Sequence, residues 1–451
     1  MADIAKTAKV EKSATLAGCL FLAVFSYFWV GLNAFPDPNA ASLSTPYGGT
    51  SNVLNQLIVI AMSALVLVTV LQNPARHLLL RPYGLLICLL VWLLFTGLFA
   101  GDPSAAFRRI VFAVLVCLCA NAVLLIPRDG EQFAKLTCLG LTFTLGLSYF
   151  GVIAMPHLAI HQATDALEQS LAGDWRGHFG HKNVAAAAMV YAVFFGFYIA
   201  SAGHARLGLM IALSAGFFVL HAGGKTSAAM LPAILLLAWI FERWIRLAIL
   251  MLIGGLAGLN AILLTAAISP SFSSLLASAG IDPTFTDRSS IWRLALSAIA
   301  ERPIIGYGFQ SFWQTDALFN SGQAMTTWAV TAANSHNGYV EQLINGGIPA
   351  LAMVVVWLVI LPIGYARRAL AGSNDIALTR LFLRIWLFSL FLACLESPFF
   401  GNSGPIWFTM LIAVFGLRLQ ANAGLVVSAP ASLGSVPVRG EMTVRRETGK
   451  E

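Results

Sequence analysis

Residues 245–269 read IRLAILMLIGGLAGLNAILLTAAIS and contain a single charged residue, Arg246. A helix needs about 20 apolar residues to cross the hydrocarbon core of a bilayer, so this stretch predicts a transmembrane helix. Similar runs recur along the chain, near 14–35, 53–72, 83–100, 109–126, 133–154, 184–201, 207–222, 227–241, 347–363, 382–396 and 405–418. The sequence therefore predicts an all-α polytopic integral membrane protein with about 12 transmembrane helices.

The composition excludes the main alternative classes. Of 451 residues, 58% are hydrophobic and 10% are charged, and the mean hydropathy is +0.79. A soluble domain carries about 25% charged residues, and a membrane β-barrel has alternating rather than continuous apolar segments. The net charge is +7, but the basic residues form short clusters between apolar runs, so no nucleic-acid partner is expected. The six cysteines lie within apolar runs without Cys-x-x-Cys spacing, which predicts neither disulfides nor a thiolate metal site.

The basic residues also predict the orientation. Placing residues 1–13 in the cytoplasm puts most of the 27 lysines and arginines on the cytoplasmic side, as the positive-inside rule requires. Residues 14–269 then hold the first nine spans and 347–418 the last three, while 419–451 form a disordered cytoplasmic tail. Two segments, 155–183 and 270–346, face the periplasm and are too long to be simple connections. The larger is expected to be partly helical and catalytic.

The larger segment contains TDRSSIWRLALSAIAERP at 286–303, followed by IIGYGFQSFW. Asp287 or a following serine can cap an amphipathic helix that Pro303 ends, and Gly306 and Gly308 allow a tight turn. Arg288 then lies at the helix start beside unpaired backbone N–H groups, a combination that suits phosphate. An interfacial helix whose arginines meet lipid headgroups is an equally good interpretation.

The same segment ends with NSHNGYVEQLINGGIP at 334–349. Asn334 or Ser335 is the expected N-cap, His336 is expected on one helical face with Tyr339, Val340 and Leu343, and Gly346-Gly347 ends the helix. The dipole at a helix start favours neutral imidazole, the form that a general base requires. A histidine that caps the helix or faces headgroups is the alternative.

The shorter segment carries DWRGHFGHKN at 174–183. Arg176 and Lys182, beside glycines, suit an anionic ligand such as a pyrophosphate, although cations that reach lipid headgroups would look similar. The spacings of His157 with His161, and of His178 with His181, also suit zinc, but the pairs are far apart without HExxH, so no metal is predicted. The turn GGKTS at 223–227 lacks the upstream glycine of a phosphate-binding Walker loop.

Taken in order, the motifs GHKN at 180–183, GGKTS at 223–227, DRSSIW at 287–292, ERPIIGYG at 301–308 and SHNGY at 335–339 resemble the O-antigen ligase and Wzy-polymerase superfamily. The resemblance covers roughly residues 50–420. The GHKN and GYGFQSFW versions are most similar to bacterial exopolysaccharide polymerases of the succinoglycan type. Lipid A core ligases share the same framework, so both activities stay open.

The resemblance implies a glycosyltransferase of the bacterial inner membrane with its active site facing the periplasm. The donor would be an undecaprenyl-diphosphate-linked oligosaccharide and the acceptor a lipid-linked repeat or lipid A core, in an inverting transfer without cofactor or metal. A chain-length regulator is a further expected partner. By motif position, His336 is the base and Arg288 and Arg176 bind the diphosphate. Further substrate-binding or orienting residues would be Lys182, Asn183, Lys225, Trp292 and Asn337.

Two other classes fit the same topology. A lipid-glycan flippase or twelve-helix transporter would also need about 12 spans, but transporters place ionisable residues near the bilayer midplane. Here the span interiors hold almost no charge, and Glu396, at a span end, is the nearest exception. A non-enzymatic assembly subunit would need no Arg176, Arg288 and His336 set.

Overall fold

In a computed structural model the chain is described over residues 2–37, 39, 53–72, 76–80, 83–165, 169–322, 327–372, 375–401 and 404–422. These residues are helical or irregular, and their one β pairing is an isolated antiparallel bridge between Ile160 and Trp175. The predicted all-α polytopic architecture is confirmed.

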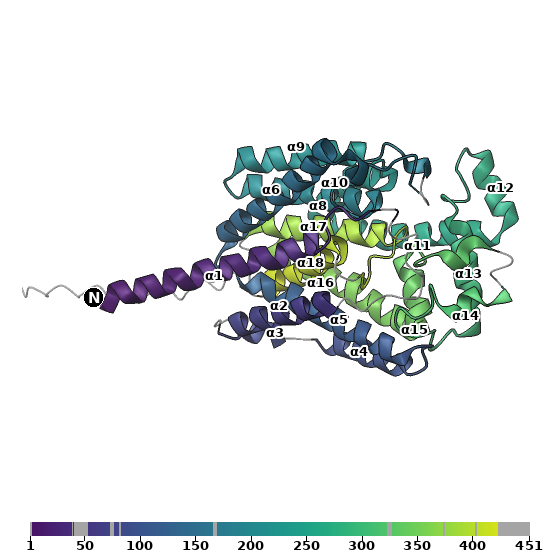
Figure 1. The fold of residues 1–451 in the computed structure, drawn as a ribbon, viewed down its shortest axis with the longest axis horizontal. Helices are drawn as coiled ribbons and strands as arrows, with labels where there is room; N and C mark the ends of the chain where they lie inside the picture. The colour runs from purple at the N-terminus through teal and green to yellow at the C-terminus, as the bar shows by residue number, and fades with distance from the viewer. Residues whose placement is uncertain are drawn as a thin grey trace, which may run out of the picture.

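Every predicted span coincides with a helix, and these helices lie side by side in Figure 1. They are α1 (Ala2–Val30), α2 (Val53–Leu71), α4 (Gly84–Gly97), α5 (Pro103–Ala122) with η3 (Val123–Leu125), α6 (Gly130–Ala154), α8 (Lys182–Ser201), α9 (Ala205–His221), α10 (Lys225–Arg243), α11 (Ile245–Ile268), α15 (Gly338–Val355) with η7 (Val356–Ile360) and α16 (Leu361–Gly372), α17 (Ile376–Leu392) and α18 (Pro405–Asn422). Within the described residues, seven helices are long and apolar enough to cross a membrane, and three shorter apolar helices accompany them.

Short helices fill the two long segments and one connection. They are α3 (His77–Leu80), α7 (Pro156–Ala159), η4 (Gln169–Leu171), α12 (Pro270–Ser278), α13 (Arg288–Glu301), α14 (Asp316–Phe319) and η6 (Trp328–Thr331). Figure 1 shows α12, α13 and α14 together at one end of the bundle. Ile291 and Leu294 of α13 belong to a buried apolar cluster with Phe312 and Trp313, so segment 270–346 has a small core of its own.

Both ends of the described chain are helical. Residues 2–13, which the sequence predicts as the cytoplasmic N-terminus, belong to α1. Helix α18 runs to Asn422, so residues 419–422 are not part of a disordered tail, because Leu419 and Gln420 are each only 5% exposed and packed. Residues 423–451, also predicted as disordered, lie outside the described residues.

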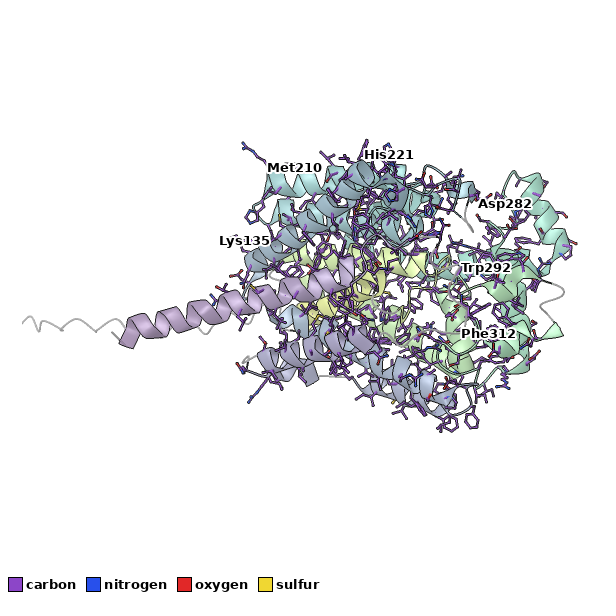
Figure 2. The ribbon with its side chains drawn as sticks, in the orientation of Figure 1. Lys135, Met210, His221, Asp282, Trp292 and Phe312 are labelled. Atoms are coloured by element: carbon purple, nitrogen blue, oxygen red, sulfur yellow. The ribbon has the colours of Figure 1, made fainter. Side chains whose placement is uncertain are left out.

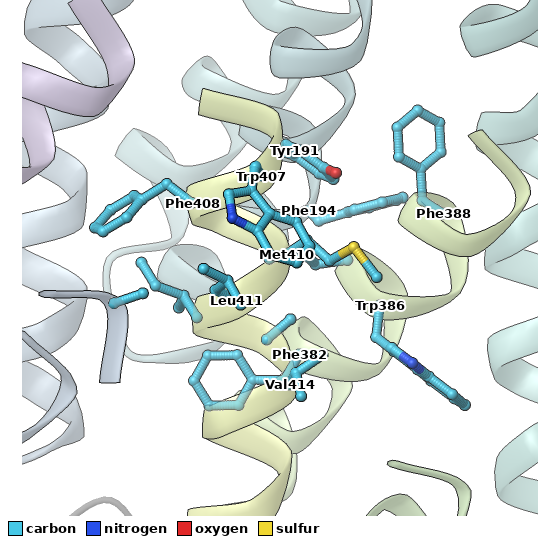
Figure 3. Packing of buried hydrophobic residues seen from close by; sticks show 14 of the residues in the cluster. Tyr191, Phe194, Phe382, Trp386, Phe388, Trp407, Phe408, Met410, Leu411 and Val414 are labelled. Atoms are coloured by element: carbon cyan, nitrogen blue, oxygen red, sulfur yellow. The ribbon is translucent and has the colours of Figure 1, made fainter. Parts of the chain in front are cut away.

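The centre of the bundle is formed by α8, α17 and α18. Figure 3 shows Tyr191 and Phe194 of α8 near Phe388, Trp407 and Met410, and the Tyr191 hydroxyl lies 2.7 Å from Ser389 Oγ. Helix α9 approaches α8 closely at a glycine, since a Cβ at Gly208 would lie 2.3 Å from Ala200 N. Small residues permit such close packing of helices in membranes. This buried helix α8 carries Asn183 at its start.

Helix α15 is broken near its middle. Gly346 and Gly347 have non-helical dihedral angles, and Gly347 has a φ of +70°. The freed backbone carbonyls are satisfied, because Trp92 Nε1 donates to Gly346 O at 2.7 Å and Tyr307 N donates to Ile344 O at 2.8 Å. Gly346 and Gly347 are buried, and buried backbone groups require such partners. The expected helix end at Gly346-Gly347 is therefore a break inside α15.

The ERPIIGYG motif packs into this break. A Cβ at Gly306 would lie 2.4 Å from Ile344 O, and a Cβ at Gly347 would lie 2.0 Å from Ile304 O. Ile348 N also donates to Pro303 O at 2.9 Å. The motif thus fixes the end of α13 against α15. Arg288 is the first residue of α13, and His336 lies just before α15.

Candidate active site

Arg288 is the first residue of α13, as predicted. The chain enters the helix through Phe285, Thr286 and Asp287, which all have φ between 49° and 63°. Asp287 occupies the N-cap position, but its side chain makes no capping hydrogen bond, so that part of the prediction is wrong. The left-handed backbone of Asp287 explains the difference, since a capping side chain normally sits on extended backbone. The helix ends at Glu301, before Pro303, as expected.

His336 lies just before α15 rather than on its surface. The N-cap is Asn337, whose Oδ1 accepts hydrogen bonds from Tyr339 N at 3.0 Å and Val340 N at 3.1 Å. The prediction of Asn334 or Ser335 as the cap is wrong, because Asn334 Oδ1 instead accepts from His336 N at 2.9 Å in a local turn. His336 has a φ of 47° and so does not share the predicted helical face with Tyr339 and Val340.

Both predicted residues meet at Glu396, in the connection between α17 and α18. Glu396 Oε1 accepts from Arg288 Nη2 at 2.7 Å and from Asn183 Nδ2 at 3.0 Å. Glu396 Oε2 lies 3.2 Å from His336 Nδ1. Arg288 Nη1 also donates to the carbonyl of Leu395. We call Asn183, Arg288, His336 and Glu396 the Glu396 cluster.

The surroundings of Glu396 are strongly positive. Helices α8, α13 and α15 all begin close to Glu396, because Asn183, Arg288 and His336 at or beside their starts contact its carboxylate. The N-terminus of a helix carries a partial positive charge. Burial favours the neutral acid, but the hydrogen bond from His336 and the charge of Arg288 together lower the pKa of Glu396 to about 2. The side chains of Arg288, Glu396 and His336 are 15%, 22% and 31% exposed, so the cluster is partly accessible to solvent.

Asn337 and Trp292 hold the segment that carries His336. Asn337 Nδ2 donates to Asn260 Oδ1 at 2.8 Å and to Cys394 O at 3.0 Å, and Trp292 Nε1 donates to Ser335 O at 2.9 Å. Asn337 and Trp292 are both fully buried. These contacts fix the backbone on both sides of His336, and Figure 2 shows Trp292 at the end of the bundle formed by α12 to α14.

The other predicted cations lie outside the Glu396 cluster. Lys182 forms an ion pair with Asp174. The Asp174 carboxylate packs on the turn that precedes Lys225, since a Cβ at Gly223 would lie 2.2 Å from Asp174 Oδ1. Arg176 is completely enclosed by protein. Of the residues predicted in GHKN, the structure therefore brings Asn183 to Glu396 and directs Lys182 to a neighbouring carboxylate.

The histidines of segment 155–183 are largely structural. His178 Nδ1 lies 2.7 Å from Ser148 Oγ and Nε2 lies 3.0 Å from Trp29 O, which ties the segment to α6 and α1. His181 Nδ1 accepts from Asn183 N at 3.0 Å and caps α8. His161 lies 3.2 Å from Asp165. Across the described part of the chain, no three His, Cys, Asp or Glu side chains converge as a metal site would need.

His178 predicts an acid-sensitive step in stability. Burial lowers the pKa of His178 from 6.5 to about 4, so the folded protein keeps this ring neutral while the unfolded chain protonates it. Stability is therefore expected to fall as the pH drops from about 6.5 to 4, by about 3 kcal/mol at the limit. In detergent, the thermal midpoint of the wild type should drop more between pH 7 and pH 4.5 than that of His178→Gln. His157→Gln, at an exposed ring, is the matched control, and equal drops for wild type and His178→Gln would contradict the assignment.

Glu396 belongs to the candidate site, but the sequence predicts no role for it there. One signal was present, because Glu396 is the only charged residue between Arg384 and Arg418. A carboxylate in so apolar a stretch is costly unless it is paired. Its partners come from residues 183, 288 and 336, and no spacing along the chain reveals that they converge.

Two comparisons show which known proteins the chain is similar to. Residues 207–355, which include Arg288 and His336, match the family model described as O-antigen ligase. A curated relative, the exopolysaccharide production protein ExoQ of Rhizobium meliloti (strain 1021), is 25% identical over 107 residues, which cover 22% of this chain and 24% of the relative. The aligned part is thus about a quarter of that protein's length. The resemblance predicted from the motifs is confirmed: residues 207–355 are similar to the O-antigen ligase family.

Proposed function

We propose that this membrane protein transfers a glycan from undecaprenyl diphosphate to a glycan acceptor at the periplasmic face of the bacterial inner membrane, by a metal-independent inverting reaction. The observation that carries the proposal is that Arg288 and His336, which belong to two separate motifs, both contact the partly exposed carboxylate of Glu396. The family match supports glycan transfer in general terms.

The proposed reaction is a single displacement. His336 takes the proton from an acceptor hydroxyl, and the acceptor oxygen attacks the anomeric carbon of the donor. The bond between that carbon and the phosphate oxygen breaks, and its electron pair leaves on undecaprenyl diphosphate. Arg288 has five N–H donors, of which Leu395 O and Glu396 engage two, so the same guanidinium can also stabilise the departing diphosphate.

Two acceptors are candidates, each favoured by one comparison. The relative named for exopolysaccharide production favours polymerisation of lipid-linked repeats, and the family description favours transfer to lipid A core. Deleting the gene and examining lipopolysaccharide gels together with secreted glycan size separates them. Loss of polymeric exopolysaccharide with a normal lipopolysaccharide ladder supports the polymerase, which we favour. Loss of the ladder with unattached lipid-linked O-antigen would support the ligase.

The orientation is tested by labelling. Figure 2 places Lys135 at the end of the bundle opposite to Asp282 and Trp292, in keeping with periplasmic segments 155–183 and 270–346 and cytoplasmic termini. Cysteines at Ser273 and Asn320 should react with an impermeant maleimide in cells whose outer membrane is permeabilised. Ser201→Cys, at the opposite end of α8 from Asn183, should not react until the inner membrane is opened. The reverse pattern would overturn the orientation.

A further inference from the structure

The ionisation of Glu396 decides which nitrogen of His336 carries the proton. A pKa of about 2 leaves Glu396 as a carboxylate near neutral pH, and a carboxylate only accepts hydrogen bonds. The 3.2 Å contact between Glu396 Oε2 and His336 Nδ1 therefore requires the proton on Nδ1. The lone pair of the neutral ring is then on Nε2, the nitrogen able to receive a proton from an acceptor.

The carboxylate is itself fixed from its other side. Arg288 Nη2 and Asn183 Nδ2 both donate to Oε1, which leaves Oε2 directed at His336. Arg288 Nη1 holds the adjacent carbonyl of Leu395, and Ser397 Oγ accepts from Asn337 N at 3.1 Å. Both ends of residues 395–397 are thus pinned to the helix starts that flank the ring.

We propose that Glu396 is a positioning residue for the transfer reaction, which holds His336 in the tautomer that exposes Nε2 and stabilises the imidazolium formed when His336 takes the acceptor's proton. The inference rests on the proposed role of His336 as the base. In this arrangement Arg288 and Asn183 also orient the Glu396 carboxylate, and that carboxylate orients His336.

An amide at position 396 should disturb this arrangement in a specific way. The oxygen of a glutamine can still accept from Arg288 and Asn183, but its NH2 group then faces His336 and donates to Nδ1. That bond places the ring proton on Nε2, which can no longer accept one. In catalytic triads the equivalent acid-to-amide change keeps the geometry and lowers turnover by about 10,000-fold.

The test is the purified protein with Glu396→Gln, assayed for turnover of a lipid-linked donor and for binding of undecaprenyl diphosphate. We expect kcat to fall by about 100- to 10,000-fold, while the diphosphate binds at least as tightly as to wild type, since a nearby negative charge has been removed. Glu341→Gln is the matched control. Glu341 Oε2 accepts from Ser335 N at 2.8 Å and Trp313 Nε1 at 3.1 Å, and a glutamine oxygen can accept both bonds.

A double variant shows whether Glu396 acts through the ring. Adding Glu396→Gln to His336→Ala should lower turnover little further than His336→Ala alone, because the effects of substitutions are not additive for residues that act as a unit. The charged groups that face His336 are Glu396, Glu341 and, through Glu396, Arg288. Of the single variants Glu396→Gln and Glu341→Gln, the first should show this non-additivity with His336→Ala, because Glu396 Oε2 lies 3.2 Å from His336 Nδ1.

The outcomes separate this inference from the proposed function. If His336→Ala abolishes turnover while Glu396→Gln keeps more than about a third of it, Glu396 is only structural and the inference is wrong. If His336→Ala is fully active, the proposed base fails instead. Should Glu396→Gln not fold, Glu396→Asp replaces it. The shorter carboxylate keeps the charge for Arg288 but withdraws from His336, so the same loss of kcat is expected, and wild-type kcat would overturn the inference.

Discussion

His336→Ala is expected to yield folded protein that still binds undecaprenyl diphosphate but forms product about 100- to 10,000-fold more slowly, the usual range for loss of a general base. The variant should fold because Asn337, not His336, caps α15, and because Trp292 holds the backbone at Ser335 independently of the ring. Turnover of a purified lipid-linked donor, with diphosphate binding measured in parallel, checks both parts.

His336→Gln provides the sharper comparison. Glutamine can keep a hydrogen bond to Glu396 but cannot take up a proton near neutral pH. A glutamine variant that retains most of the activity would show that His336 positions the acceptor and is not the base. The wild-type rate should also fall on acidification, since protonated imidazole cannot accept the acceptor's proton.

Arg288→Lys is expected to lower turnover by about 30- to 1,000-fold, equivalent to about 2–4 kcal/mol of transition-state stabilisation. The structure strengthens the reason for this prediction. Arg288 uses two separate nitrogens to hold Leu395 O and Glu396, and a single ammonium group cannot reproduce that fork together with a phosphate contact.

Arg293→Lys is the matched control, because Arg293 lies on the same helix, is exposed and bonds only to Ser290 Oγ among its described contacts. It should stay within about twofold of wild type, as expected for a surface change of equal charge. Near-wild-type turnover by Arg288→Lys would remove Arg288 from the site.

The fold was largely predictable because its main signal is local. Each apolar run predicted as a span coincides with a helix between α1 and α18. The predictions that were wrong concern features for which neighbouring polar groups compete, such as the cap of a helix. Asn337, rather than Asn334 or Ser335, caps α15, because Asn334 closes a turn on His336.

The glycines of the motifs show the same limit. The pair at 346–347 reads as a helix end, and the backbone does leave the helix there. The chain then re-enters helix at once, because Trp92, Tyr307 and Pro303 satisfy the exposed groups of the break. Those partners come from α4 and from the segment after α13, and no local pattern in the sequence announces them.

The candidate site was half predictable. Arg288 and His336 carry recognisable chemistry at helix starts, and the structure brings them together. Lys182 and Lys225 have equally suitable chemistry, but Asp174 pairs with the first and packs against the turn before the second. Glu396 was missed because its meaning depends on three partners from distant parts of the chain.

The most direct test of the central claim is stoichiometric transfer by the purified protein in liposomes. Supplied with its lipid-linked repeat and an acceptor, the wild type should release one undecaprenyl diphosphate for each repeat added to the glycan, as measured by mass spectrometry of both products. Arg293→Lys should match it, and His336→Ala and Glu396→Gln should release almost none over the same time. Equal release by wild type and His336→Ala, or glycan growth without diphosphate release, would contradict the account.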